Sequence, residues 1–214
     1  ATARAAESVA ENGAETPGAT ATPMKLWKTV DLSACPVSFP CLGDLNGDGK
    51  VDFLLYRQGP QTTPGYLVAV DHRGRKLWER GDASIDRHAP DGKYNEPALR
   101  GIALVYDLDS DGDSEVVTEL WDDGKPMLCV LDGATGHVER RIASPLDPAV
   151  RGGERSRCHP LGRIAHLHGQ DGPPSIVLKY EASGNVPSHA VALSPSLVVQ
   201  WHFRGHPDAI GHIP

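Results

Sequence analysis

One acidic pattern of nine residues occurs twice in this chain and restricts its possible folds more than any other feature. The copies are Asp44-Leu-Asn-Gly-Asp-Gly-Lys-Val-Asp52 and Asp107-Leu-Asp-Ser-Asp-Gly-Asp-Ser-Glu115. A hard cation such as Ca²⁺ takes about six to eight oxygen ligands from a tightly curled backbone, and glycine permits the sharp turn. The pattern therefore predicts two calcium sites. Their side-chain ligands are Asp44, Asn46, Asp48, Asp52, Asp107, Asp109, Asp111 and Glu115, and Lys50 and Asp113 contribute backbone carbonyl oxygens.

Two alternative interpretations of these loops fit less well. Ordinary polar surface turns have no reason to repeat the same ligand spacing. An EF-hand needs a glutamate at position 12 and a helix on each side. Position 12 is Leu55 in the first loop and Thr118 in the second, and the segments 51–56 and 115–120 have the β-branched and aromatic composition of strands. The loops are therefore predicted to belong to a β protein.

A longer repeat surrounds the loops. Asp44 and Asp107 are 63 residues apart, Asp71 and Asp132 are 61 apart, and Trp78 and Trp201 are 123 apart, which is two periods. Each unit contains four short apolar segments, and four antiparallel strands at a constant period are typical of a β-propeller blade. The predicted strands are 39–43, 52–57, 66–71 and 76–79; 101–106, 115–120, 126–132 and 137–142; and 162–168, 176–180, 188–193 and 197–203.

The repeat predicts an all-β partial propeller of about three four-stranded blades. We expect a disordered leader or linker over 1–23, and then blades over 24–79, 80–142 and 143–203, with the start of a further blade at 204–214. Closed propellers have about four to eight blades, so we expect a fragment of a larger ring. The segment 25–28 resembles 76–79 and is predicted to be an isolated outer strand. The third unit retains only Asp171-Gly172 of the acidic pattern, so no metal is expected there.

Composition limits the partners and the compartment. The formal net charge of −7 and the lack of a basic stripe argue against nucleic acid. No apolar run is long enough to span a bilayer. Cys35 and Cys41 bracket a short loop and could pair, whereas Cys129 is expected to be a buried thiol. Calcium loops fit an extracellular or periplasmic location, where calcium is abundant.

The strand order places the acidic loops and the third-to-fourth-strand hairpins on one face of the propeller and the long blade-to-blade crossovers on the other. Crossover loops that converge at the mouth of a propeller are a natural place for a binding site. They contain cationic, histidine and tyrosine residues that suit an anionic ligand such as a uronate. His166 and His168 have no further ligand nearby, so we do not predict a zinc site.

The acidic block resembles the FG-GAP/VCBS calcium-binding repeat of integrin-type propellers and of many secreted bacterial proteins. A narrower resemblance is to the propeller polysaccharide lyases, which include rhamnogalacturonan, ulvan and rhamnose–glucuronate lyases. It rests on Leu42–Gly49, Arg100–Asp109, Ile176–Tyr180, the Trp201 strand and Gly211-His-Ile-Pro214. The last segment is similar to the Gly-His-Tyr-Pro that precedes a further calcium repeat in that family. The resemblance covers residues 24–214.

The lyase resemblance implies β-elimination on a uronic acid, with an acidic polysaccharide as substrate. Such a reaction needs a cation to neutralise the substrate carboxylate, a base and an acid. Candidates for the cation are Arg100, Arg157 and Lys179, and candidates for the base or acid are His88, His159, His212 and Tyr180. A non-catalytic FG-GAP binding or adhesion module is the alternative function, because a fold does not by itself determine activity. Nothing in the sequence fixes an acidic pair for glycoside hydrolysis.

Overall fold

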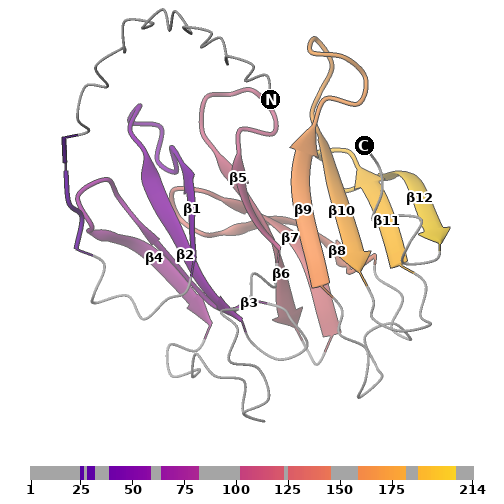
Figure 1. Cartoon of the computed structure of the whole chain (residues 1–214), viewed down its shortest axis with the longest axis horizontal. Coiled ribbons are helices and arrows are strands. Elements are labelled where there is room, and N and C mark those ends of the chain that lie inside the picture. The colour runs from indigo at the N-terminus through magenta and orange to yellow at the C-terminus, as the bar shows by residue number, and fades with distance from the viewer. Residues whose placement is uncertain are drawn as a thin grey trace, which may run out of the picture.

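The structure is a computed structural model that describes residues 25–26, 28–31, 39–58, 64–81, 102–122, 125–145, 159–181 and 188–205. Twelve strands form three four-stranded antiparallel sheets (Figure 1). The first sheet is β1 (Phe39–Gly43), β2 (Asp52–Gln58), β3 (Pro64–Val70) and β4 (Lys76–Gly81). The second is β5 (Ala103–Tyr106), β6 (Glu115–Asp122), β7 (Lys125–Asp132) and β8 (Val138–Ala143). The third is β9 (His159–Ala165), β10 (Ser175–Glu181), β11 (Ser188–Leu193) and β12 (Val199–Gly205).

The repeat predicted from the sequence is visible in the hydrogen bonding. Each sheet follows chain order, and its register shifts at the same place between the third and fourth strands: at Ala69/Val70, Val130/Leu131 and Ala192/Leu193. A register shift of this kind marks a β-bulge, which bends a strand and increases its twist. Three sheets with one shared irregularity are three copies of one structural unit, and the all-β partial propeller is confirmed.

The sheets stand side by side with their first strands adjacent. β1 contacts β5, and β5 contacts β9, so the first strand of each blade lines one edge of the assembly (Figure 1). The strands approach closely at two glycines. A Cβ at Gly43 would lie 2.2 Å from the Val105 side chain, and a Cβ at Gly162 would lie 2.9 Å from the Leu104 side chain. Gly43 is therefore needed for the first two blades to meet, whereas at Gly162 the end of the flexible Leu104 side chain would have to shift.

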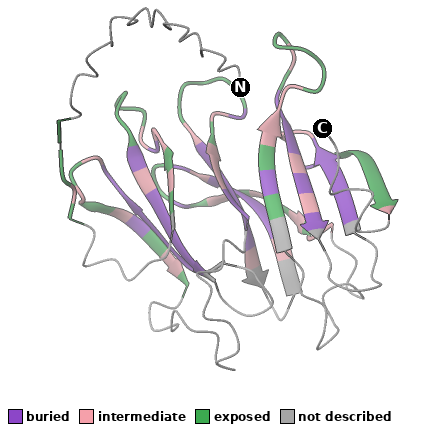
Figure 2. Ribbon diagram, viewed as in Figure 1, coloured by how far each residue is buried: buried purple, intermediate pink, exposed green. Residues whose placement is uncertain are grey.

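Apolar side chains fill the spaces between the blades. Leu54, Leu67, Val116 and Leu131 belong to a buried cluster between the first two sheets. Ile102, Leu128, Leu178 and Leu193 belong to a second cluster between the last two. Alternation along each strand sends every second side chain to the same face, so both faces of the central sheet are buried (Figure 2). A strand buried on both faces reads as a continuous apolar run, as residues 128–131 do.

The outer strands differ between the first and third blades. Trp78 on β4 is buried, and its Nε1 donates a 2.7 Å hydrogen bond to the carbonyl oxygen of Gly133 in the second blade. Arg80 donates from Nη1 to the carbonyl oxygen of Gly136, 3.0 Å away. Trp201 occupies the same register position on β12 but is 42% exposed. The difference follows from the neighbours of the two strands, since the second blade covers β4 and no described blade lies beyond β12 (Figure 2).

Two expectations need correction. The described residues of the segment 25–28, which are Lys25, Leu26 and Lys28, belong to no strand, and Leu26 is 79% exposed. A strand needs a partner edge for its backbone groups, and the described part of the chain provides none at this segment. The first strand of the third blade ends at Ala165 and not at His168, because a turn begins at Leu167. Within the described residues, no helix is long and apolar enough to cross a membrane.

Candidate functional site

The two acidic loops have the same internal hydrogen bonding. The first aspartate of each, Asp44 or Asp107, accepts the backbone N–H of the glycine at position 6. That glycine has a positive φ, 75° at Gly49 and 100° at Gly112, as the sharp turn requires. The aspartate at position 5 of each loop accepts the N–H at position 7. The sequence repeat therefore produces a geometrical repeat, in which the backbone curls around the carboxylates.

The last acidic residue of each loop is buried. Asp52 has no exposed surface and Glu115 is 5% exposed, and each accepts the backbone N–H at loop position 2, from Leu45 and Leu108 respectively. These two leucines are also buried and fasten each loop to the core. An unpaired buried carboxylate is costly to fold, so a cation beside it would lower that cost.

The ionisation of these carboxyls reflects their surroundings. Burial raises the pKa of Glu115 from 4.5 to about 7, the N–H of Leu108 lowers it, and the nearby charges of Asp109, Glu139 and Asp111 raise it again. Burial also raises the pKa of Asp52, against hydrogen bonds from His72 and Leu45 that lower it. Both groups are therefore held in surroundings that disfavour their negative charge. A bound divalent cation would stabilise the negative charge of both carboxylates.

Ligand atoms converge in both loops. Oxygen atoms of Asp107, Asp109 and Glu115 all lie within 4.8 Å of one another. In the first loop the converging atoms come from Asp48, Asp52 and His72, under the same limit. Carboxylates gathered on a curled backbone are the donors that Ca²⁺ prefers, so the residues present fit that ion. Neither loop brings all of its predicted carboxylate ligands into its cluster: Asp44 is outside the first, and Asp111 is outside the second.

The residues at position 7 differ in the contacts of their side chains. Lys50 Nζ lies 3.1 Å from Asp48 Oδ2 and forms an exposed ion pair across the first loop. The side chain of Asp113 lies against the first loop, since a Cβ at Gly47 would be 2.1 Å from Asp113 Oδ1. The two loops are therefore neighbours on one rim of the assembly. The corresponding turn of the third blade contains one acidic residue, Asp171, which is exposed.

The topology places the loops as the sequence predicted. His72, in the hairpin between β3 and β4, donates its backbone N–H to Asp52 Oδ1 at 2.8 Å. The loop after β1 and the hairpin after β3 therefore share one rim, the upper one in Figure 1. The ends of β2 and β10 and the beginnings of β5 and β9 lie at the opposite rim. Of the predicted catalytic residues, His88, Arg100, Arg157 and His212 lie outside the described residues.

Tyr180, one of the predicted catalytic residues, is buried and hydrogen-bonded inside the protein. Its ring is completely buried between the second and third blades, and its hydroxyl donates a 3.1 Å hydrogen bond to Glu119 Oε1. Ser144 Oγ donates to the same oxygen at 2.5 Å. A hydroxyl group without exposed surface does not contact a bound polysaccharide, so the contacts of Tyr180 stabilise the interface between the second and third blades.

Lys179 and His159 lie near each other in the third sheet. Lys179 is half-buried on β10 and pairs with Leu161 on β9, while His159 begins β9 opposite Glu181. The two residues therefore occupy diagonal positions of one antiparallel ladder, a spacing of about 7–8 Å between backbone positions. They are the two predicted site residues that the described strands bring together at the rim opposite the acidic loops.

Two polar contacts between residues far apart in the sequence were not predicted. His72 lies beside the acidic carboxylates of the first loop, and its place directly after Asp71 in a hairpin of the same rim was the available signal. Tyr106 and His166 join the second and third blades, with 3.0 Å between the tyrosine hydroxyl and Nε2. Their contact depends on how two inner strands pack, which no local pattern encodes.

Comparison with known proteins identifies the fold. No family model and no curated protein matches the chain. Among solved structures, rhamnogalacturonan lyase YesW matches with a TM-score of 0.57 and 21% identity over 79% of this chain and 34% of that one. The Bacillus licheniformis rhamnogalacturonan lyase PL11 gives 0.57 and 20%, over 79% and 34%. The exotype rhamnogalacturonan lyase YesX gives 0.56 and 20%, over 79% and 33%.

These three structural neighbours are all rhamnogalacturonan lyases, and the chain spans about a third of the length of each. At this level of identity the likeness establishes a shared fold. It agrees with the polysaccharide-lyase resemblance found in the sequence.

Proposed function

We propose that this chain is part of a propeller that binds a uronic-acid-containing polysaccharide and cleaves it by β-elimination. The observation that carries the proposal is the shared fold with three rhamnogalacturonan lyases. The lyase-like segments of the sequence, including Ile176–Tyr180, support it independently. The acidic loops lie at the rim opposite the beginnings of β5 and β9, so their proposed role is to stabilise the blades.

The chemistry of the proposed reaction sets what the site must supply. The C5–H bond of the uronate breaks and its proton passes to a base, while the C4–O bond breaks and the leaving oxygen receives a proton from an acid. The electron pair from C5–H forms the C4=C5 double bond of the product. A cation beside the carboxylate makes the C5 proton acidic by stabilising the charge that develops in the transition state.

We assign Lys179 the role of carboxylate neutraliser, with Arg100 and Arg157 as the alternatives on the crossover segments. The base and the acid are sought among His88, His159 and His212, since imidazole transfers protons near neutral pH. Lys179 and His159 share one end of the β9–β10 ladder, which suits two groups that act on one sugar.

We further propose that the acidic loops bind Ca²⁺ and that the protein works in an extracellular or periplasmic setting. A calcium ion held by carboxylates at positions 1, 3 and 9 of the second loop would join the end of β5 to the start of β6. Binding to the folded state alone raises stability by mass action. The buried carboxylates of Asp52 and Glu115 support the assignment.

A binding experiment tests the proposed polysaccharide partner. The chain in calcium buffer would be run through gels containing rhamnogalacturonan, polygalacturonate or a neutral galactan. We expect retardation by the two acidic polymers only. Lys179→Ala should weaken the retardation roughly ten- to a hundredfold, because a hydrogen bond between charged groups contributes roughly 1.5–3 kcal/mol. Lys76→Ala, an exposed lysine on β4, is the matched control. Equal retardation by the neutral polymer contradicts the proposal.

A further inference from the structure

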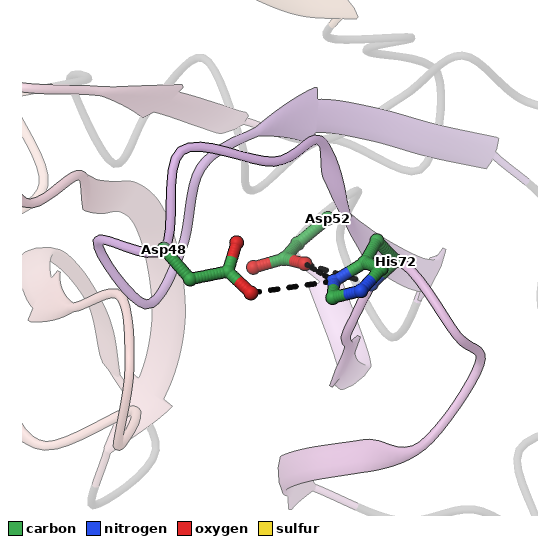
Figure 3. Close-up of side chains that lie close together, drawn as sticks. All are labelled: Asp48, Asp52 and His72. Carbon is green, nitrogen blue, oxygen red and sulfur yellow. Dashed lines mark hydrogen bonds and ion pairs between the residues drawn. The ribbon is translucent and has the colours of Figure 1, made fainter.

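The first acidic loop has a neighbour that the second does not. His72 lies in the hairpin between β3 and β4, with its Nδ1 atom 3.4 Å from Asp48 Oδ2 and 3.8 Å from Asp52 Oδ1 (Figure 3). The carbonyl oxygen of His72 accepts a 2.6 Å hydrogen bond from Lys28 Nζ, and its N–H donates to Asp52. The backbone of His72 is therefore fixed on both sides, and its ring is placed against the two carboxylates.

The ring nitrogen that faces the carboxylates is buried and forms no hydrogen bond, and its two contacts with Asp48 and Asp52 are ion pairs only when the ring is protonated. The side chain of His72 is 14% exposed, and the Nδ1 atom itself is inaccessible to solvent. A buried polar atom without a partner costs free energy. Asp52, beside it, has no exposed surface at all. Asp48 accepts a hydrogen bond from Lys50 Nζ, and Asp52 accepts the backbone N–H groups of Leu45 and His72. A cation bound between the three side chains would give Nδ1 its missing partner and add positive charge beside both carboxylates.

The spacing of the three donors suits one shared cation. Ligands about 2.1 Å from a metal ion, at angles between a right angle and a tetrahedral one, lie roughly 3.0–3.4 Å apart. The His72–Asp48 separation of 3.4 Å falls at the end of that range, and the His72–Asp52 separation of 3.8 Å is slightly wider. A larger ion such as Ca²⁺ also tolerates these separations, so the type of donor atom decides the selectivity.

The second loop provides the internal comparison. The residue that follows Asp132 in its hairpin, as His72 follows Asp71, is Gly133. A Cβ at Gly133 would lie 2.0 Å from the carbonyl oxygen of Ser114, so no side chain fits at that position. The converging donors of the second loop are oxygens from Asp107, Asp109 and Glu115. One repeat therefore excludes the imidazole that the other holds in place.

We propose that the first loop is a mixed nitrogen and oxygen site for a borderline divalent ion of the Zn²⁺ or Co²⁺ class, with His72, Asp48 and Asp52 as ligands. Imidazole nitrogen favours these ions over Ca²⁺, whereas an all-carboxylate site favours Ca²⁺. The inference rests on the proposal that both loops bind cations, and it replaces Ca²⁺ by a borderline ion in the first loop only. The two loops of one repeat then select different ions through a single hairpin residue.

Cobalt gives a direct test, because Co²⁺ replaces Zn²⁺ and absorbs visible light when bound. The metal-free chain would be titrated with Co²⁺ in excess Ca²⁺, alongside His72→Ala and the control His137→Ala, which removes an exposed histidine from the corresponding hairpin of the second blade. We expect the native chain and His137→Ala to bind one Co²⁺ equally well. His72→Ala should bind it at least about tenfold more weakly, since one of three side-chain ligands is lost.

Unchanged cobalt affinity in His72→Ala overturns the inference. A second measurement avoids any folding defect of that variant: the Nδ1 resonance of His72 in the native chain should shift when Zn²⁺ is added, and an unshifted resonance also overturns the inference. Calcium binding at the second loop distinguishes the two proposals. If Ca²⁺ still binds to the native chain and Asp111→Ala abolishes that binding, only the inference about the first loop has failed. If neither cobalt nor calcium binds, both proposals fall together.

Discussion

The packing of Trp78 gives the sharpest test of the propeller architecture. Its indole lies between the first two blades, 8% exposed, and donates to the carbonyl oxygen of Gly133 across the interface. The hairpin that receives it is closely fitted, since a Cβ at Gly136 would lie 2.6 Å from the indole ring. Trp201 has the same register position on the outer strand of the third blade and is 42% exposed. The chain therefore contains its own control residue.

The expected cost follows from these contacts. Trp78→Ala removes a buried aromatic side chain and should lower the free energy of unfolding by about 3–5 kcal/mol. Trp78→Phe keeps most of the apolar surface but leaves the buried Gly133 carbonyl without its indole donor, at a cost of about 1–3 kcal/mol. Trp201→Ala removes a side chain that is nearly half in solvent, so its cost should stay below about 1 kcal/mol.

Urea unfolding followed by far-ultraviolet circular dichroism measures these differences without relying on tryptophan fluorescence. The midpoint should fall in the order Trp201→Ala, Trp78→Phe and Trp78→Ala, from least to most affected. An unchanged slope would show that the variants lose stability and not compactness. Equal losses for Trp78→Ala and Trp201→Ala would refute the argument, because the two sites would then be packed alike.

Three further outcomes follow from the structure. Chelation of divalent ions should lower the melting temperature, and Asp48→Ala and Asp111→Ala should each remove one ion per chain; an unchanged ion count in both variants contradicts the loop assignment. With a chelator present, the stabilisation from protonated Glu115 should be complete below pH 4.5 and should be lost as the pH rises through about 7. The change in the free energy of unfolding should be no more than about 2 kcal/mol, because solvent screens the exposed acidic neighbours of Glu115. Glu115→Gln should abolish this pH dependence, and the same pH slope in that variant would rule out the assignment. Tyr180→Phe should cost about 1 kcal/mol in urea unfolding and leave polysaccharide binding unchanged, whereas lost binding would show that Tyr180 contacts the polymer.

The strands could be predicted from the sequence because each is a short apolar run between turn residues. The predicted and observed bounds agree closely for Phe39–Gly43 and Ser188–Leu193. The end of β9 was missed because the apolar pattern continues to Leu167, whereas the chain turns after His166 and that ring contacts Gly172 and Tyr106. Local patterns report a strand, but contacts between blades decide where it stops.

The curled geometry of the acidic loops was predictable because all of the carboxylates that accept its backbone N–H groups lie within nine residues. The role of His72 was not, since it lies 20 residues beyond Asp52 and reaches the loop through the fold. The same reason explains Trp201: its sequence resembles that of Trp78, but burial depends on a neighbouring blade. Cys129 was correctly expected to be a buried thiol, and Cys41 is also a free thiol that donates to the carbonyl oxygen of Ala103.

The thiol of Cys41 bears on the possible disulfide with Cys35, which lies outside the described residues. Burial raises the pKa of the Cys41 thiol to about 11, which keeps it protonated and unreactive near neutral pH. Its hydrogen bond crosses from the first blade to the second, so its contribution is to their interface.

The proposed function is tested most directly by looking for the product of β-elimination. The chain would be incubated with rhamnogalacturonan and with polygalacturonate in calcium buffer, and the ultraviolet absorbance of the C4=C5 double bond followed over time. We expect a steady rise that a neutral galactan does not give and that Lys179→Ala slows. A flat trace with both acidic polymers, under conditions in which gels show that the chain binds them, would contradict the elimination chemistry and favour a non-catalytic binding module.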